Sequence, residues 1–126
     1  MKREIIFRSA FFSNKDNKFS YFSYWGFINH KGEYDDRCFT SPGTSSHDYI
    51  KTNDQYTGLK DKTGKKIFEG DIVSHSSDDY TTFPSEIKFI DGMFCFFNKP
   101  IGHTELIESL LYCEVIGNIY ENSELL

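Results

Sequence analysis

Residues 55–73 read QYTGLKDKTGKKIFEGDIV and combine turn-forming residues with strand-forming ones. Asp61–Lys65 has the composition of a hairpin turn, in which Gly64 can adopt the positive φ that tight turns require. Glu69-Gly70-Asp71 predicts a second turn. The apolar residues beside these turns predict two short strands; they are Ile67, Phe68, Ile72 and Val73. The run therefore favours a β fold, and its conspicuous residues form turns and strands, with no catalytic chemistry.

The composition of the whole chain also favours strands. Of its 126 residues, 38% are hydrophobic and 17% are aromatic. Phe and Tyr must therefore supply most of the core, and both residues are common in strands. Ala10 is the only alanine, which argues against a helical bundle. A chain of this length is typical of one domain, here with two small subdomains.

Polar turns divide the rest of the chain into further elements. Strands are predicted at residues 4–9, 19–28, 85–90, 93–97 and 115–120, with Asp91-Gly92 as a hairpin turn. Residues 38–53 are predicted to be the least structured stretch, which leads into a short extended or helical segment near Tyr49. Thr104 is a candidate helix cap, because apolar residues follow it at helical spacing, namely Leu106, Ile107, Leu110 and Leu111.

These elements predict a mainly β protein, with a β-rich α+β domain as the alternative. Residues 1–54 would form an aromatic-rich N-terminal β subdomain that offers a surface for oligomerisation. Residues 55–126 would form a small SH3-like, barrel-type subdomain with one short helix.

Aromatic residues fill 8 of the 17 positions from Phe11 to Phe27. In a strand over residues 19–28, one face would carry Phe19, Tyr21, Trp25 and Phe27, and the other Phe22, Tyr24 and Ile28. Such a strand is either central in its sheet or covers a partner. Core packing is one interpretation, and a homo-oligomeric interface is the other, because interface cores are rich in aromatic residues. The predicted interface consists of Phe19, Tyr21, Phe22, Tyr24, Trp25 and Phe27.

The net charge of −5 opposes non-specific binding to nucleic acid. Residues 1–59 carry 8 basic and 7 acidic side chains, whereas residues 60–126 carry 6 basic and 12 acidic ones. The acidic half could itself mimic DNA toward a basic host protein. A local nucleic-acid contact is conceivable at the hairpin, near Tyr56 and Phe68; its lysines are Lys60, Lys62, Lys65 and Lys66. A solvated turn that protects a sheet edge from aggregation is the commoner role of such lysines.

No motif in the sequence predicts an enzyme, a cofactor or a metal site. The spacing of Gly58, Gly64 and Lys66 departs from the phosphate-loop pattern. The three cysteines, Cys38, Cys95 and Cys113, contain no Cys-x-x-Cys pair and are expected to be free, mostly buried thiols in a reducing cytoplasm. No signal peptide and no membrane-spanning stretch is found. We therefore expect a cytoplasmic protein with no membrane contact.

Three blocks of sequence carry a family resemblance: residues 2–8 (KREIIFR), residues 55–73 and residues 114–126 (EVIGNIYENSELL). In this order they resemble the YopX family of bacteriophage and prophage proteins. The chain departs from that family where Ser9-Ala10-Phe11-Phe12 replaces a frequent Ala-Trp-Asp, and where Ser123 replaces a usual Pro.

The resemblance implies a phage or prophage origin in a bacterial host, and self-association, but no defined biochemical role. We therefore expect a non-enzymatic module that binds a partner or self-assembles. A nucleic-acid-associated accessory protein that uses the lysine-rich hairpin is the alternative.

Overall fold

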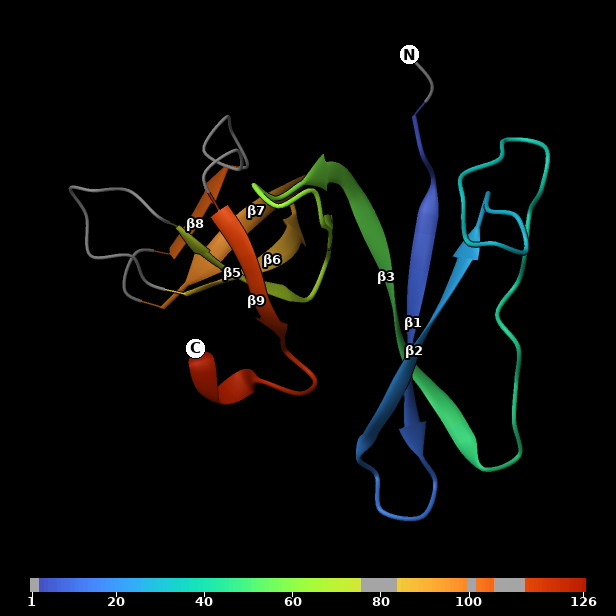
Figure 1. Ribbon diagram of the computed structural model, residues 1–126. Helices are drawn as coiled ribbons and strands as arrows, with labels where there is room; N and C mark the ends of the chain where they lie inside the picture. The colour runs from blue at the N-terminus through green and yellow to red at the C-terminus, as the bar shows by residue number, and fades with distance from the viewer. Residues whose placement is uncertain (1–2, 76–83, 100–101, 106–112) are drawn as a thin grey trace. The chain divides into compact units, whose positions relative to one another are not determined.

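The computed structural model describes residues 3–75, 84–99, 102–105 and 113–126, and β-strands dominate these residues (Figure 1). The elements are β1 (Ile6–Ser13), β2 (Phe19–Gly26), β3 (Asp48–Lys60), β4 (Lys66–Phe68), β5 (Asp71–His75), β6 (Ser85–Ile90), β7 (Met93–Asn98), β8 (Gly102–Glu105), β9 (Cys113–Asn118) and the 3₁₀ turn η2 (Ser123–Leu125). The prediction of a mainly β protein is confirmed. The chain divides into two compact units, Met1–Gly58 and Leu59–Leu126.

The first sheet has the strand order β2-β1-β3-β4, so β1 is central and β2 lies at an edge. The edge position of β2 excludes the central placement considered for residues 19–28. β1 takes the central place because both of its faces are buried from Arg8 to Phe12. β3 extends from the first unit across the boundary at Gly58, and the sequence-based boundary after residue 54 falls inside this strand.

A β-bulge between β1 and β2 changes the predicted face of Phe19. Phe11 lies opposite Tyr21 and Phe12 lies opposite Phe19, so Ser20 is the extra residue. One extra residue reverses the alternation of side chains along a strand. Phe19 therefore shares a face with Phe22, whose ring centroid lies 4.8 Å away, instead of with Tyr21.

The short extended or helical segment expected near Tyr49 is a strand, and it is much longer than expected, so the prediction of little structure over residues 38–53 fails from residue 48 onward. Asp48–Lys60 is a 13-residue strand that pairs with β1 in antiparallel register. Its apolar partners are on β1: the ring of Tyr49 lies against Phe12, at 6.0 Å between centroids. A polar segment can form a strand here because the neighbouring strand supplies the apolar surface.

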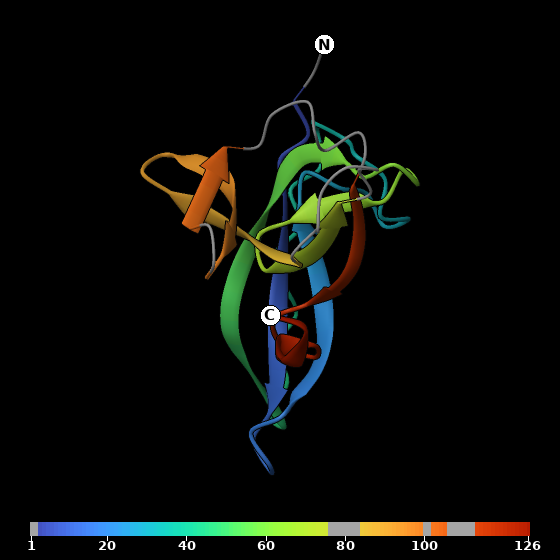
Figure 2. The same ribbon diagram turned by 90° about the vertical axis from the view of Figure 1, so that its left-hand side faces the viewer.

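The second sheet has the order β8-β7-β6-β5-β9 and antiparallel pairing throughout. Figure 2 shows β6, β7 and β8 side by side. The core beneath it contains Ile67, Val73, Ile87, Phe96 and Cys113. The hairpin turn predicted at Asp91-Gly92 is confirmed, and the positive φ of both residues, 52° and 81°, is typical of type I′.

The sequence also predicted that this unit closes into a barrel and contains one short helix. Within the described residues no ladder joins β8 to β9, and the sheet ends on these two strands. Thr104, predicted to cap a helix, belongs to β8, because its backbone pairs with Phe96. The four apolar residues expected to form that helix, at positions 106–111, lie outside the described residues.

The central run forms both predicted turns. Gly64 and Gly70 have φ of 89° and 84°, which glycine adopts without steric cost. Asp61 N–H donates to the carbonyl of Lys65 at 2.8 Å and closes the hairpin. In the second turn the carboxylate of Asp71 accepts the N–H of Phe68 at 2.8 Å. The Asp71 carboxylate thus satisfies a backbone donor of the second turn.

Candidate functional site

One face of the first sheet is joined across three strands by aromatic rings and hydrogen bonds. Phe7 stacks on Trp25 at 4.7 Å between centroids, and Phe11 stacks on Tyr21 at 4.8 Å. The Trp25 indole N–H donates to the Ser9 hydroxyl at 2.9 Å, and that hydroxyl donates to Asn53 Oδ1 at 2.5 Å. We call this the tryptophan face; its members are Phe7, Ser9, Phe11, Tyr21, Trp25 and Asn53.

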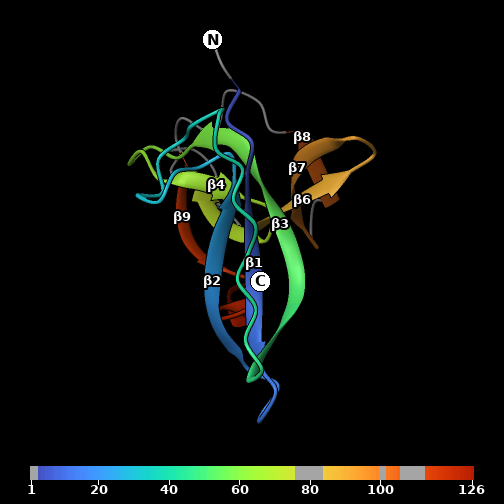
Figure 3. The ribbon, with the colours of Figure 1, turned by 90° about the vertical axis from the view of Figure 1, so that its right-hand side faces the viewer.

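The segment between β2 and β3 runs along this side of the first unit (Figure 3). Phe39 from this segment makes edge contacts with Trp25 and Phe27, at 6.0 and 5.4 Å between ring centroids. Trp25 and Phe27, two of the predicted interface residues, therefore have aromatic partners within their own unit. Phe39 remains 60% exposed.

The opposite face combines aromatic rings with cations. The guanidinium of Arg8 lies 4.0 Å from the ring centroid of Phe22 and 3.5 Å from the carboxylate of Asp54. Arg8 is only 4% exposed, so the ion pair and the cation–π contact are largely shielded from water. Phe19, Phe12 and Tyr24 lie on the same face. We call it the arginine face; its members are Arg8, Phe12, Phe19, Phe22, Tyr24 and Asp54.

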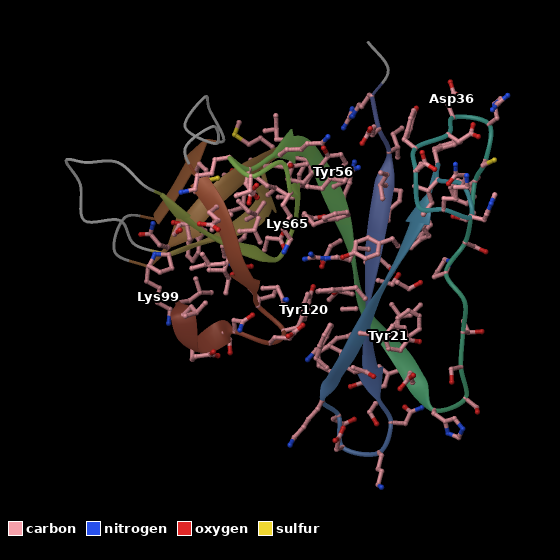
Figure 4. All side chains as sticks on the ribbon, viewed as in Figure 1. Tyr21, Asp36, Tyr56, Lys65, Lys99 and Tyr120 are labelled. Atoms are coloured by element: carbon pink, nitrogen blue, oxygen red, sulfur yellow. The ribbon has the colours of Figure 1, made fainter. Side chains whose placement is uncertain are left out.

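The edge strand β2 exposes one tyrosine on each side of the sheet. Tyr21 on the tryptophan face is 41% exposed and Tyr24 on the arginine face is 50% exposed. Figure 4 labels Tyr21 among the side chains of this sheet. The other four predicted interface residues, Phe19, Phe22, Trp25 and Phe27, are half-buried. Phe39 also belongs to the exposed aromatic surface, although it was not among the predicted interface residues. In the sequence it is recognisable only as a single aromatic residue within a polar stretch.

The lysine-rich hairpin, including Lys60 at the end of β3, lies in the second unit. Lys60, Lys62 and Lys65 are exposed, and Lys66 is half-buried. Lys62 Nζ lies 3.8 Å from Glu114 Oε2. Tyr56 and Phe68, which sequence reasoning placed beside these lysines as stacking partners, are both buried. Neither ring therefore offers a surface on which a base could stack.

The pKa values of the three cysteine thiols are raised above the ordinary value, mainly by burial. Cys38, Cys95 and Cys113 are free thiols, and the last two are fully buried. Burial raises the pKa of Cys113 to about 11. Burial also raises the pKa of Cys38, and the Asp35 carboxylate raises it further. In the described part of the chain, no three His, Cys, Asp or Glu side chains come together as metal ligands.

These observations define a two-unit, mainly β protein with an aromatic edge strand. The sequence profile of the YopX protein family matches residues 7–126, so this chain belongs to the YopX family. It is similar to protein EF1440 from Enterococcus faecalis, whose crystal structure superposes with a TM-score of 0.53 at 25% sequence identity, over 98% of this chain and 99% of that one. No curated protein matches the chain. Among the described residues, no helix has the length and apolar character needed to cross a membrane.

Proposed function

We propose that this protein is a non-enzymatic binding module that self-associates through the edge strand β2. The observation that carries the proposal is the position of β2 at the end of its sheet, with Tyr21 and Tyr24 exposed on its two sides. An edge strand directs backbone donors and acceptors outward and so provides a template for another strand. The protein would act in the cytoplasm of a bacterial host and be encoded by a phage or prophage, as its family resemblance implies.

The sequence of β2 favours pairing with another strand and lacks most of the features that shield an edge strand from such pairing. Natural edge strands are commonly shielded by charged residues, proline or bulges. FSYFSYWG contains neither a charged residue nor a proline, and the bulge is confined to its start, because residues 21–26 pair with β1 in regular register. At its other end, Gly26 exchanges two backbone hydrogen bonds with Thr40. The candidate pairing segment is therefore Tyr21–Trp25.

A second copy of the chain is the partner that this edge suits best. Two copies of β2 can pair in antiparallel orientation about a two-fold axis, which uses the same surface on both subunits. Such pairing would extend each four-stranded sheet into one of twice the size. It would also bury the exposed tyrosines, which are residues enriched at interfaces.

Light scattering at 10–200 μM, a range set by typical weak homodimers, tests this proposal. We expect the native protein to dimerise, and the double variant Tyr21→Lys/Tyr24→Lys to dimerise at least about tenfold more weakly, because it places two like charges at the pairing edge. Phe89→Lys is the matched control, since Phe89 is an exposed aromatic residue on β6 of the other sheet. A strictly monomeric native protein, or equal dimerisation of the double variant and the native protein, would contradict the proposal. Thermal unfolding of each variant checks that it is folded.

The alternative function, contact with nucleic acid, is supported by the exposed Lys60, Lys62 and Lys65. It is opposed by the excess of acidic residues over residues 60–126 and by the Glu114 carboxylate beside Lys62. Fluorescence anisotropy with single- and double-stranded DNA and RNA distinguishes the two functions. Hairpin binding would weaken steeply as salt is raised and would be lost in a variant with all three lysines changed to alanine.

A further inference from the structure

The second unit has a cleft on the outer face of β6 and β7. It has a volume of about 340 Å³. Its lining includes Glu86 and Lys88 from β6, Phe97 from β7, Lys99 just after β7, and the C-terminal Leu125 and Leu126. Glu86 lies opposite Phe97 in the strand register. These residues alternate with Ile87 and Phe96, which point into the core. The cleft therefore lies on the face of the sheet opposite to the core.

The cleft contains two lysines although the unit around it is mostly acidic. Residues 60–126 contain only 6 basic side chains against 12 acidic ones, yet Lys88 and Lys99 both line this cleft. Lys88 Nζ lies 4.3 Å from the ring centroid of Phe97, which holds its ammonium group over the floor. Burial raises the pKa of the third ionisable group, Glu86, although the nearby Lys88 opposes this shift. Among the described side chains that line the cleft, two ammonium groups therefore stand beside one carboxylate, in a unit whose charged residues are mostly acidic.

The apolar wall comes from the C-terminal turn. Leu125 and Leu126 are both exposed, and Figure 4 shows Lys99 close to this turn. The turn is fixed to β9 by Asn122, whose Oδ1 accepts the N–H of Asn118 at 3.2 Å and whose carbonyl accepts the N–H of Leu125 at 2.9 Å. Exposed leucines that line the same cleft as an aromatic side chain suit an apolar ligand.

We propose that this cleft binds a small organic anion with an apolar body, such as a medium-chain carboxylate. The anionic headgroup pairs with Lys88 and Lys99, and the apolar body packs against Phe97 and the two leucines. The volume lies at the lower end of the range for small-molecule sites, which is roughly 300–1,000 Å³, so the ligand is small. The inference is independent of self-association through β2, because the described residues that line the cleft all belong to the other unit.

Titration calorimetry and amide chemical-shift mapping of the full chain test the cleft with three probes. The probes are decanoate below its micellar concentration, decyltrimethylammonium, which has the same chain and the opposite charge, and acetate, which lacks the chain. We expect saturable decanoate binding at least about tenfold tighter than binding of either other probe. The shifts should concentrate at Lys88, Phe97 and Leu125.

Variants separate the headgroup contribution from the chain contribution. Lys88→Gln/Lys99→Gln and Leu125→Ser should each weaken decanoate binding at least about tenfold. Lys51→Gln is the matched control, because Lys51 also places its ammonium near an aromatic ring, 4.7 Å from that of Phe12, but lies in the first unit. Equal affinity for decanoate and decyltrimethylammonium, shifts away from the cleft, or unchanged binding by the lysine double variant would overturn the proposal. Thermal unfolding confirms that each variant is folded.

Discussion

Replacement of Asp61 by alanine is expected to lower the free energy of unfolding of the second unit by about 3–4 kcal/mol. Asp61 Oδ1 accepts the N–H groups of Thr63 and Lys65, at 2.8 and 2.9 Å, and the Thr63 hydroxyl at 2.7 Å. Asp61 Oδ2 accepts the N–H of Val115 on β9 at 2.9 Å. The side chain is nearly buried, at 6% exposure, so alanine would leave these backbone donors without their acceptor. Urea unfolding followed by far-ultraviolet circular dichroism measures the loss.

Two further variants separate the role of this carboxylate from a general effect of losing an acidic turn residue. Asp61→Asn retains one acceptor oxygen but turns an amide toward the other donors, and we expect it to lose roughly half as much stability. Asp16→Ala removes a carboxylate that accepts the N–H of Lys18 in the exposed turn after β1, and it should cost less than about 1 kcal/mol. If Asp61→Ala were no more costly than Asp16→Ala, the carboxylate would not hold the hairpin to β9.

The same hydrogen bonds predict how stability depends on pH. Burial alone would raise the pKa of Asp61, but the N–H donors of Val115, Thr63 and Lys65 outweigh it and lower the pKa below the ordinary value of 3.8. A carboxylate with a depressed pKa in the folded state stabilises the fold above its unfolded pKa, and this contribution is lost as the pH falls through the folded pKa. The advantage of the native protein over Asp61→Asn should therefore be complete above about pH 5 and shrink below pH 3.8. An advantage that stays constant from pH 6 to pH 3 would contradict the assignment.

The turns of the central run were predictable because their determinants are local. Gly64 and Gly70 stand where the chain requires positive φ, and sequence spacing alone locates such positions. The bond from Asp61 to Val115 was not predictable in this way, since it joins residues 54 positions apart. A local pattern identifies Asp61 as a turn residue. Only the tertiary fold makes it a link between the hairpin and β9.

The candidate sites also depend on tertiary contacts that local sequence patterns do not reveal. The aromatic content of β2 indicated an interface, but a bulge at Ser20, invisible in the alternation, decides which rings share a face. The length of the polar strand β3 escaped prediction, because its apolar contacts come from β1 and only a short extended or helical segment near Tyr49 was expected. The cleft of the second unit brings together residues from three segments between positions 84 and 126. Lys88 and Lys99 carry no motif in the sequence, and they become a site only when the hairpin of β6 and β7 places them in one cleft.

Replacement of Gly26 by alanine is expected to destabilise the first unit by about 3 kcal/mol or more. Gly26 has φ of 111°, and an added Cβ would lie 2.7 Å from the carbonyl oxygen of Ile5 and 3.3 Å from Ile6 Cα. Both neighbours are backbone atoms of the chain entering the central strand, so they cannot move aside without disturbing β1. Fluorescence of Trp25, the only tryptophan and the adjacent residue, reports unfolding of this unit.

Gly32→Ala is the matched control for this clash. Gly32 also has positive φ, of 80°, but an added Cβ there would meet nothing within 4 Å. Its substitution should therefore cost only the backbone strain, roughly 1 kcal/mol. The difference between the two variants isolates the steric term, because both replace a glycine in the left-handed region of the first unit. If the two glycines cost the same, the contact between the end of β2 and the start of β1 is looser than the structure places it, and the edge offered for self-association would be less firmly defined.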